Sequence, residues 1–372
     1  MQIREGAIYF PNLNGLRFLA AGMVIVHHIE QIKALFYLDS YWDKIPSVNL
    51  IGKLGVYLFF VLSGFLITYL LLSEERKTST INIKEFYMRR ILRIWPLYFL
   101  IIFLAFVILP NINIFIIPNY GKNVIYSNLY LKIFLYVILF PNLVLTMLGM
   151  VPFASHTWSI GTEEQFYIIW PVLFKRIKKY RLSLMILIVV FYLFMGEFLI
   201  SDFSKHIPIR DIIQPYWGTF RIDCMAIGGF FGIVLFQKNR LLKVFLNNTI
   251  FYVILVSTIL FIALGIYLHT IIYSILFGIL ILNFSSNKEL KISLENSTLN
   301  YLGKISYGLY MFHPIGIVLA LYIVQLMHFT TNWILYPFSF IITIIIATLS
   351  YKYFESIFLK FKSRFSKQQK TL

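Results

Sequence analysis

Apolar residues in this chain gather into long runs that are separated by short polar segments. A helix that crosses the hydrocarbon core of a bilayer needs about 17–25 predominantly apolar residues. Ten runs approach or reach that length, and we expect a membrane-spanning helix in each: 16–36, 53–72, 94–112, 160–175, 182–200, 216–236, 245–267, 269–284, 306–327 and 333–354. The pattern predicts an all-α integral membrane protein, a bundle of about ten transmembrane helices that forms a single domain over residues 1–372, with no soluble domain.

One further apolar stretch, residues 130–151, has a different pattern. Pro141, Asn142, Gly149 and Pro152 interrupt or end it. Proline removes a helical hydrogen bond, and irregular backbone is tolerated at membrane depth only where protein or water satisfies its polar groups. We therefore expect a re-entrant or surface helix at 130–151 rather than an eleventh span.

Basic residues are distributed unevenly between the apolar runs. The chain has 33 Lys and Arg residues against 16 Asp and Glu residues, a formal net charge of +17. Such a charge can indicate nucleic acid or anionic lipid as a partner, but basic clusters between apolar runs are typical of membrane topology. With both termini in the cytoplasm, 25 of the 33 basic residues fall on the cytoplasmic side. We expect a multi-pass protein of the cytoplasmic membrane that contacts the lipid bilayer and no nucleic acid.

The composition agrees with the membrane assignment and excludes two kinds of structural site. Hydrophobic residues make up 59% of the chain and charged residues 13%, whereas soluble domains carry roughly 25% charged residues. The single cysteine, Cys224, cannot form an intrachain disulfide. The chain also lacks the CxxC and His/Cys spacings of structural zinc sites, so no metal is expected.

Two polar residues in the first run lie at a spacing that places them on one helix face. Arg17 and His28 are eleven residues apart, which is close to three turns of an α-helix. His28 would lie about 16 Å deeper than Arg17, and Ala20 and Ala21 between them are small enough to let a ligand approach. His27 would point about 100° away. We expect a functional role for His28, against the alternative of a buried histidine bonded to a neighbouring helix.

A second cluster lies at the start of the third run. Arg90 and Arg93 are three residues apart and therefore share a helix face at the cytoplasmic boundary. The guanidinium fork suits phosphate groups well. The alternative is that these arginines anchor the topology by snorkelling, with Trp95 in the aromatic belt.

A third cluster contains adjacent carboxylates at the start of the fourth run. Ser159 can cap a helix there, and Glu163 and Glu164 would then lie favourably near the positive end of its dipole. A position near the helix start accounts well for one carboxylate. It accounts less well for two adjacent carboxylates that are followed by Gln165 at a membrane boundary. We expect a functional role for the pair, and the sequence does not choose between them.

Two later features favour structural interpretations. Arg221 and Asp223 open the sixth run and are best interpreted as an ion pair. His313 precedes Pro314, a residue that frees a backbone carbonyl in a helix, and the imidazole can help to satisfy that break.

Five segments, in order, resemble the membrane acyltransferase-3 family, the group that O-acetylates bacterial surface polysaccharides: 14–28, 55–67, 89–96, 158–171 and 306–314. The resemblance covers nearly the whole chain and implies a ten-helix domain. It also implies acyl transfer from acetyl-CoA, or a related acyl-CoA, to a sugar hydroxyl. The family histidine falls on His28, and the family RxxR pair falls on Arg90 and Arg93.

The chain departs from the family pattern at three points. Tyr57 stands where many members carry Asp, and Thr162 replaces the usual aliphatic residue before Glu163. We expect no extracellular hydrolase-like domain, which some relatives carry, after the last run. The membrane domain would then complete transfer itself or pass the acyl group to a separate periplasmic or extracellular protein.

Together these features predict a membrane-bound O-acetyltransferase that moves an acetyl group from cytoplasmic acetyl-CoA to a hydroxyl of a cell-surface polysaccharide or lipid-linked sugar. His28 would be the general base that takes the hydroxyl proton. Glu163 or Glu164 would orient His28 or bind acceptor hydroxyls.

The donor would be a substrate rather than a permanently bound cofactor. Arg90 and Arg93 would bind the phosphates of CoA, and Arg17 would guide the donor toward His28. The partners expected are therefore an acyl-CoA donor, a carbohydrate acceptor and the bilayer, and the sequence makes no prediction of oligomeric state. The alternative is a transporter or flippase for polysaccharide precursors, which predicts internal repeats that the sequence does not show.

Overall fold

The computed structural model describes residues 2–4, 7–327, 332–362 and 365, and within them the chain is overwhelmingly helical. Each of the ten predicted runs overlaps a helix, and the second and third differ most in their limits: α1 (Leu13–Leu35), α2 (Pro46–Thr78), α3 (Ile83–Phe103), α7 (Trp158–Arg176), α8 (Arg181–Ile200), α10 (Ile222–Gln237), α12 (Asn248–Ala263), α13 (Thr270–Ser286), α15 (Ser306–Leu326) and α16 (Asn332–Ser350). The all-α membrane class is thereby confirmed.

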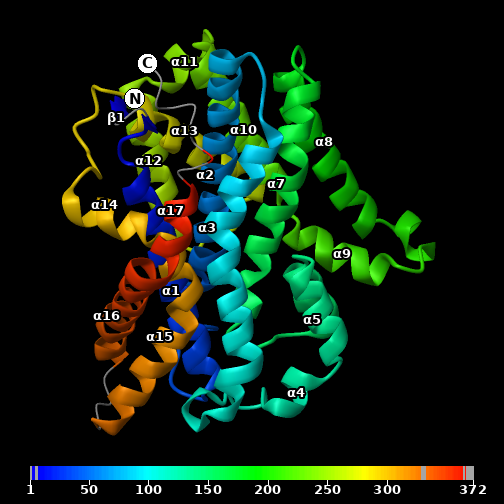
Figure 1. Ribbon diagram of the computed structural model, residues 1–372, viewed down its shortest axis with the longest axis vertical. Coiled ribbons are helices and arrows are strands. Elements are labelled where there is room, and N and C mark those ends of the chain that lie inside the picture. Colours follow the sequence, from blue (N-terminus) through cyan, green and yellow to red (C-terminus); the bar gives the residue numbers. More distant parts are fainter. Residues whose placement is uncertain (1, 5–6, 328–331, 363–364, 366–372) are drawn as a thin grey trace.

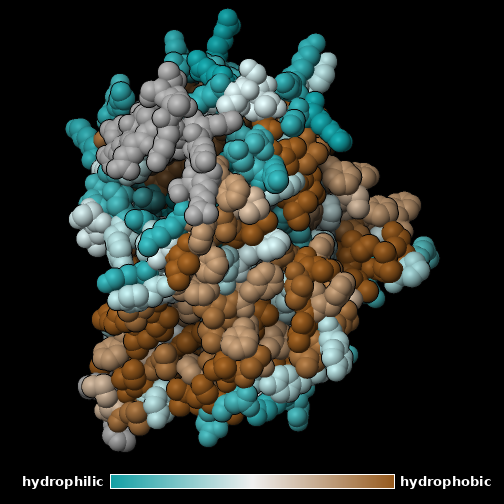
Figure 2. All heavy atoms as spheres, viewed as in Figure 1, coloured by the Kyte–Doolittle hydropathy of each residue, from teal (hydrophilic) through white to brown (hydrophobic). Residues whose placement is uncertain are grey.

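The number of spans remains a prediction. Among the described residues, seven helical segments are long and apolar enough to cross a membrane. The helices α12 and α13 are apolar but shorter. Figure 2 shows apolar side chains over the side of the bundle, while hydrophilic side chains gather at the end where β1 and α11 lie in Figure 1.

Shorter elements connect and flank these helices. The short α-helices are α4 (Lys122–Tyr126), α5 (Leu129–Val137), α6 (Pro141–Leu143), α9 (Arg210–Thr219), α11 (Leu241–Phe245), α14 (Ser297–Lys304) and α17 (Ser356–Lys362). Single π-turns occupy Leu104–Ile108, Val144–Leu148 and Tyr351–Glu355, and 3₁₀ turns occupy Leu109–Asn111, Asn113–Phe115, Ser155–Thr157 and Asp202–His206. Strands β1 (Gln2–Arg4) and β2 (Ala7–Tyr9) form an antiparallel hairpin with Gln2 opposite Tyr9.

The stretch 130–151 is broken into short pieces, as its prolines and glycine predict. It contains α5, α6 and a π-turn, none of them as long as a span. Leu139 and Gly149 adopt positive φ angles of 65° and 83°, and each marks the end of a piece. Whether this region re-enters the membrane or lies on its surface remains a prediction.

Two helices extend beyond the predicted limits because polar residues continue them. Helix α2 starts with Pro46 at its first position and continues to Thr78, where Ser79 adopts a left-handed conformation. Helix α3 begins at Ile83, capped by Asn82, whose side chain accepts a hydrogen bond of 3.2 Å from the Glu85 amide. Arg90 and Arg93 therefore lie about two and about three turns inside a well-capped helix.

At the centre of the bundle, α2 and α10 pack backbone against backbone. A Cβ atom on Gly64 would lie 2.0 Å from the Met225 carbonyl oxygen, and one on Gly228 would lie 2.1 Å from the Val61 carbonyl oxygen. Such close approach is available only to glycine. The pair supports the site, because α2 also contacts α1 and α7.

Candidate active site

A cavity of about 320 Å³ lies between α1, α2, α3, α7 and α15. At one end it is lined by Ile8, Tyr9 and Phe10, which belong to or follow β2. At the other end, deeper along α7 and α15, it is lined by Ser159 and Tyr310. Its remaining polar lining comes from Asn14, Arg17, Ser63, Arg90, Arg93, Glu163, Tyr167, Ser306 and Tyr307.

The three arginines that the sequence singled out meet in this cavity. Arg17 comes from α1, and Arg90 and Arg93 come from one face of α3. One guanidinium nitrogen of Arg17 donates to the Asn14 side-chain oxygen at 3.2 Å. The charges of Arg90 and Arg93 are close enough to Arg17 to repel it. A cluster of like charges in a partly enclosed space favours binding of an anion.

Aromatic rings fix the direction of Arg90. Its guanidinium carbon lies 5.4 Å from the centre of the Tyr167 ring and 5.6 Å from that of Phe86. Arginine stacks on such faces through a cation–π contact. Arg90 and Arg93 line the cavity, whereas arginines that only anchor the topology would point toward the membrane surface.

The two adjacent glutamates face different neighbours. Glu163 lines the cavity, where it accepts hydrogen bonds from the Ser63 hydroxyl at 3.0 Å and the Tyr167 hydroxyl at 2.8 Å. Glu164 accepts a bond of 2.8 Å from the Trp95 indole. Its other oxygen is buried and has no partner among the described residues. Of the two glutamates, Glu163 thus lines the cavity together with the arginines, which the sequence alone did not predict.

Ser159 does not cap α7, contrary to our expectation. The helix begins at Trp158 without a side-chain cap. The Ser159 hydroxyl instead shares a hydrogen bond of 2.7 Å with the Tyr310 hydroxyl, which also donates to the His156 carbonyl at 2.7 Å. Tyr310 thereby connects the deep end of the cavity to a group of histidines.

His28 lies in a row of imidazoles beyond Tyr310. Its ring centre is 4.9 Å from that of His27 and 4.7 Å from that of His313, and His156 follows at 5.1 Å from His313. His28 Nδ1 lies 2.9 Å from the Val24 carbonyl oxygen, an acceptor, so Nδ1 carries the proton and Nε2 keeps its lone pair. Neutral His28 therefore has the free nitrogen that a general base requires.

His313 satisfies the helix break at Pro314, which confirms the structural interpretation. Pro314 has no N–H to donate to the Tyr310 carbonyl, and His313 Nδ1 donates to that oxygen at 2.6 Å. The same bond leaves His313 Nε2 as an acceptor, which is buried without a partner in the part of the chain that the structure describes. The His313 ring thus lies beside the His28 ring and has one nitrogen that no described residue bonds.

Sequence reasoning missed His156 and Tyr310 as neighbours of the site. His156 Nε2 lies 3.1 Å from the Met311 carbonyl oxygen, so His156 donates there and its Nδ1 is the acceptor. The one available signal was the position of His156 at the start of the segment that contains Glu163. Glu355, on the π-turn after α16, was also missed, and its charge is close enough to interact with Arg93.

Arg221 and Asp223 form the ion pair that the sequence predicted. Their closest atoms are 2.7 Å apart, and both side chains are buried. The Arg221 guanidinium also lies 5.2 Å from the Tyr57 ring centre and 4.9 Å from that of Tyr192. Tyr57 thus contacts this arginine through its ring face.

Comparisons with known proteins identify the family to which the chain is similar. A family model described as an acyltransferase domain matches residues 10–352, which include every residue named in the site except Ile8, Tyr9 and Glu355. The peptidoglycan O-acetyltransferase OatA of Listeria monocytogenes is 27% identical over 370 residues, covering 94% of this chain and 55% of that protein. The O-acetyltransferase OatA of Staphylococcus aureus is 28% identical over 373 residues, covering 94% of this chain and 57% of that protein.

The chain spans about half the length of these curated relatives. No solved structure matches it.

Proposed function

The chain belongs to the acyltransferase domain family, and on that premise we propose that it is a membrane O-acetyltransferase that uses acetyl-CoA as donor and a carbohydrate hydroxyl as acceptor. The observation that carries this proposal is the cavity, which has an arginine cluster along it and a neutral histidine row beyond its deep end. The names of the relatives, both O-acetyltransferases, support an acetyl group and an oxygen acceptor.

The arginine cluster supplies the binding site for the donor. CoA carries several phosphate charges, and guanidinium–phosphate contacts are strong charge-assisted bonds. Arg17, Arg90 and Arg93 would hold these phosphates, and the acyl arm would extend toward Tyr310 at the deep end. The donor is thus a substrate and no resident cofactor is proposed.

His28 supplies the base. Its Nε2 takes the proton of the acceptor hydroxyl, and the hydroxyl oxygen forms a bond to the thioester carbonyl carbon. The carbon–sulfur bond then breaks, and the leaving thiolate of CoA takes the proton from the imidazolium. His313 and His156 lie beside this step as neutral groups, and their bonds to backbone carbonyls fix their tautomers.

Glu163 positions the donor site in this proposal. Ser63 and Tyr167 hold its carboxylate, whose charge interacts with Arg90 and Arg93. A direct role in orienting His28 is not supported, because the Val24 carbonyl holds the Nδ1 of that ring.

The acceptor class and the orientation are further parts of the proposal. The relative from Listeria is named for peptidoglycan, which supports a polysaccharide or lipid-linked sugar as acceptor here. We place the cavity mouth and both termini on the cytoplasmic side, on the basis of the basic clusters. A separate extracytoplasmic protein would be needed if the acyl group passes beyond the membrane domain. Membership in an acyltransferase family favours this enzyme over a transporter or flippase.

Release of CoA tests the proposal directly. Purified protein in detergent, supplied with acetyl-CoA and an N-acetylglucosamine tetramer, should liberate the CoA thiol in a reaction that depends on the tetramer. His28→Ala should reduce the rate by at least about a hundredfold, since general base catalysis contributes that much. The matched control is His269→Ala, which changes an exposed histidine at the start of α13. Equal rates for His28→Ala and wild type would refute the proposed base.

A further inference from the structure

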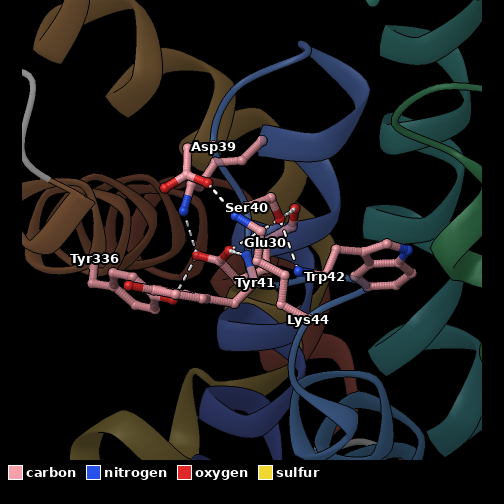
Figure 3. A network of polar contacts seen from close by, with 8 residues as sticks. Glu30, Asp39, Ser40, Tyr41, Trp42, Lys44 and Tyr336 are labelled. Carbon is pink, nitrogen blue, oxygen red and sulfur yellow. Dashed lines mark hydrogen bonds and ion pairs between the residues drawn. The ribbon is translucent and has the colours of Figure 1, made fainter.

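A buried network of polar groups lies at the end of α1 far from the cavity mouth. Glu30 and Lys33 are almost completely buried and form an ion pair of 2.7 Å. The Tyr336 hydroxyl of α16 donates to the same Glu30 oxygen at 2.6 Å. Figure 3 shows Ser40 and Tyr41, from the segment between α1 and α2, beside this carboxylate.

The second carboxylate oxygen of Glu30 holds the segment between α1 and α2. It accepts hydrogen bonds from the Tyr41 amide at 2.5 Å and from the Ser40 hydroxyl at 3.1 Å. The Ser40 oxygen in turn accepts the Trp42 amide at 3.0 Å. A buried ion pair is weak as a source of stability, and fixing a conformation is its better attested use. Here the conformation that it fixes is that of residues 40–42.

This segment places Trp42 on the histidine row. The Trp42 ring centre lies 4.6 Å from that of His27, whose ring centre is 4.9 Å from that of His28. The Asn49 side chain donates to the Trp42 carbonyl at 2.7 Å. His27 is itself held against α2, where Gly52 has no Cβ atom to displace it. The ring of His27 thus lies between Trp42 and the proposed base, His28.

Trp42 also lies on the opposite side of His28 from the donor site. Helix α1 is about 35 Å long, and Asn14 and Arg17 near its start line the cavity, while residues 36–45 follow its end. Trp42 is only partly buried, and Asp43 beside it is exposed. An acceptor that enters at the end of α1 opposite to the donor site would meet Trp42 before His28.

We propose that Trp42, held over His27 by the Glu30 network, is a binding surface for the carbohydrate acceptor as it approaches His28. This inference rests on the proposed function, which supplies the acceptor class. A tryptophan ring offers a large rigid apolar face with a polar edge, which suits the C–H face of a sugar ring. The Asp43 carboxylate beside it can accept hydrogen bonds from sugar hydroxyls.

Binding of a carbohydrate in the absence of donor tests this surface without requiring turnover. The probe is an N-acetylglucosamine tetramer with a fluorescent label at its reducing end, titrated with the full chain in detergent. Trp42→Ala should weaken its binding about tenfold or more, since buried tryptophan contacts commonly dominate recognition. Trp42→Phe should recover part of this loss. Trp333→Ala should change nothing, because Trp333 is 81% exposed at the start of α16.

A second variant separates positioning from general damage. Glu30→Gln should weaken tetramer binding and leave acetyl-CoA affinity unchanged, because Glu30 holds residues 40–42 and does not line the cavity that contains the arginines. Equal loss of both affinities would show a structural role instead.

The two proposals fail in different ways. Absence of tetramer binding to the wild type, or equal binding by wild type and Trp42→Ala, would overturn the acceptor surface. Absence of CoA release by a wild type that does bind the tetramer would overturn the proposed function alone.

Discussion

At the scale of single residues, the neighbours Glu163 and Glu164 differ in what surrounds them. Glu163 has two hydroxyl donors and lies with arginines, whereas Glu164 has one donor and an oxygen without a partner among the described residues. One residue of sequence corresponds to about 100° around a helix, so each carboxylate meets a different helix. The two substitutions to glutamine should therefore have different effects.

We expect Glu163→Gln to impair donor use and Glu164→Gln to preserve it. The first removes the negative charge that interacts with Arg90 and Arg93, and it should lower kcat/KM for acetyl-CoA about tenfold or more, which corresponds to about 1.4 kcal/mol. The second replaces a poorly partnered buried group by a neutral one of the same shape and should leave the melting temperature within a few degrees. Steady-state kinetics and thermal unfolding of both variants measure this difference. Equal kinetic loss in both would contradict the assignment of Glu163.

At the scale of one element, α3 presents two arginines to the cavity with a spacing of three residues. If they bind phosphates, Lys cannot replace them fully, since lysine keeps the charge but not the planar fork. Each charge-assisted contact is worth about 1.5–3 kcal/mol, so Arg93→Lys should weaken acyl-CoA binding by up to about tenfold, and removal of the charge should weaken it more. Arg90→Lys should lose in addition the contact with the Tyr167 ring. Affinities are measured with the protein in detergent, and unchanged values in both lysine variants would favour topology anchoring.

The contact between α2 and α10 yields a second prediction at this scale. Gly228→Ala would place a Cβ atom 2.1 Å from the Val61 carbonyl oxygen, and backbone cannot move aside as a side chain can. Overpacking typically costs about 1–3 kcal/mol, and we expect a loss at or above the top of that range. Unfolding can be followed with a thiol-reactive dye, because Cys224 is fully buried.

The matched control for that substitution is Gly196→Ala on α8. The nearest atom to a Cβ there is 3.9 Å away, in the Trp217 ring, and alanine favours a helix more than glycine does. This variant should unfold at or slightly above the temperature of the wild type. A comparable loss of stability in both variants would mean that the α2–α10 contact is not specific.

At the scale of the whole molecule, topology decides which compartment each substrate comes from. The segment 175–181 carries five basic residues, whereas the segment 39–44 that contacts the Glu30 network carries one. The positive-inside rule places the first in the cytoplasm and the second outside. A reporter fused at 175–181 should therefore signal cytoplasmic and one inserted at 39–44 external. A third at Leu372, which lies outside the described residues, should signal cytoplasmic.

If the first two reporters give opposite signals, the donor and acceptor surfaces lie on opposite sides of the membrane. This conclusion holds whichever of the two segments is the cytoplasmic one. The same signal from both would contradict an arrangement with donor and acceptor at opposite ends of α1.

The sequence by itself determined the features that arise within one helix or between residues that are close together along the chain. Hydrophobic length located the ten long helices approximately, because burial of apolar residues in lipid needs no particular partner. The period of 3.6 residues placed Arg17 with His28 on one face, and Arg90 with Arg93 on another, since rotation per residue is fixed within a helix. The His313–Pro314 contact was predictable for the same reason, because the freed carbonyl lies three residues away.

Only the tertiary structure decided which helices face one another. It brought His156 and His313 to His28 and turned Glu163 rather than Glu164 into the cavity. It also carried Tyr336 to Glu30 across 306 residues of chain. These contacts depend on how helices rotate and approach, which close packing at residues such as Gly64 and Gly228 settles. Hydrophobic patterning is nearly uniform around a helix in lipid, and it therefore carries little information about that rotation.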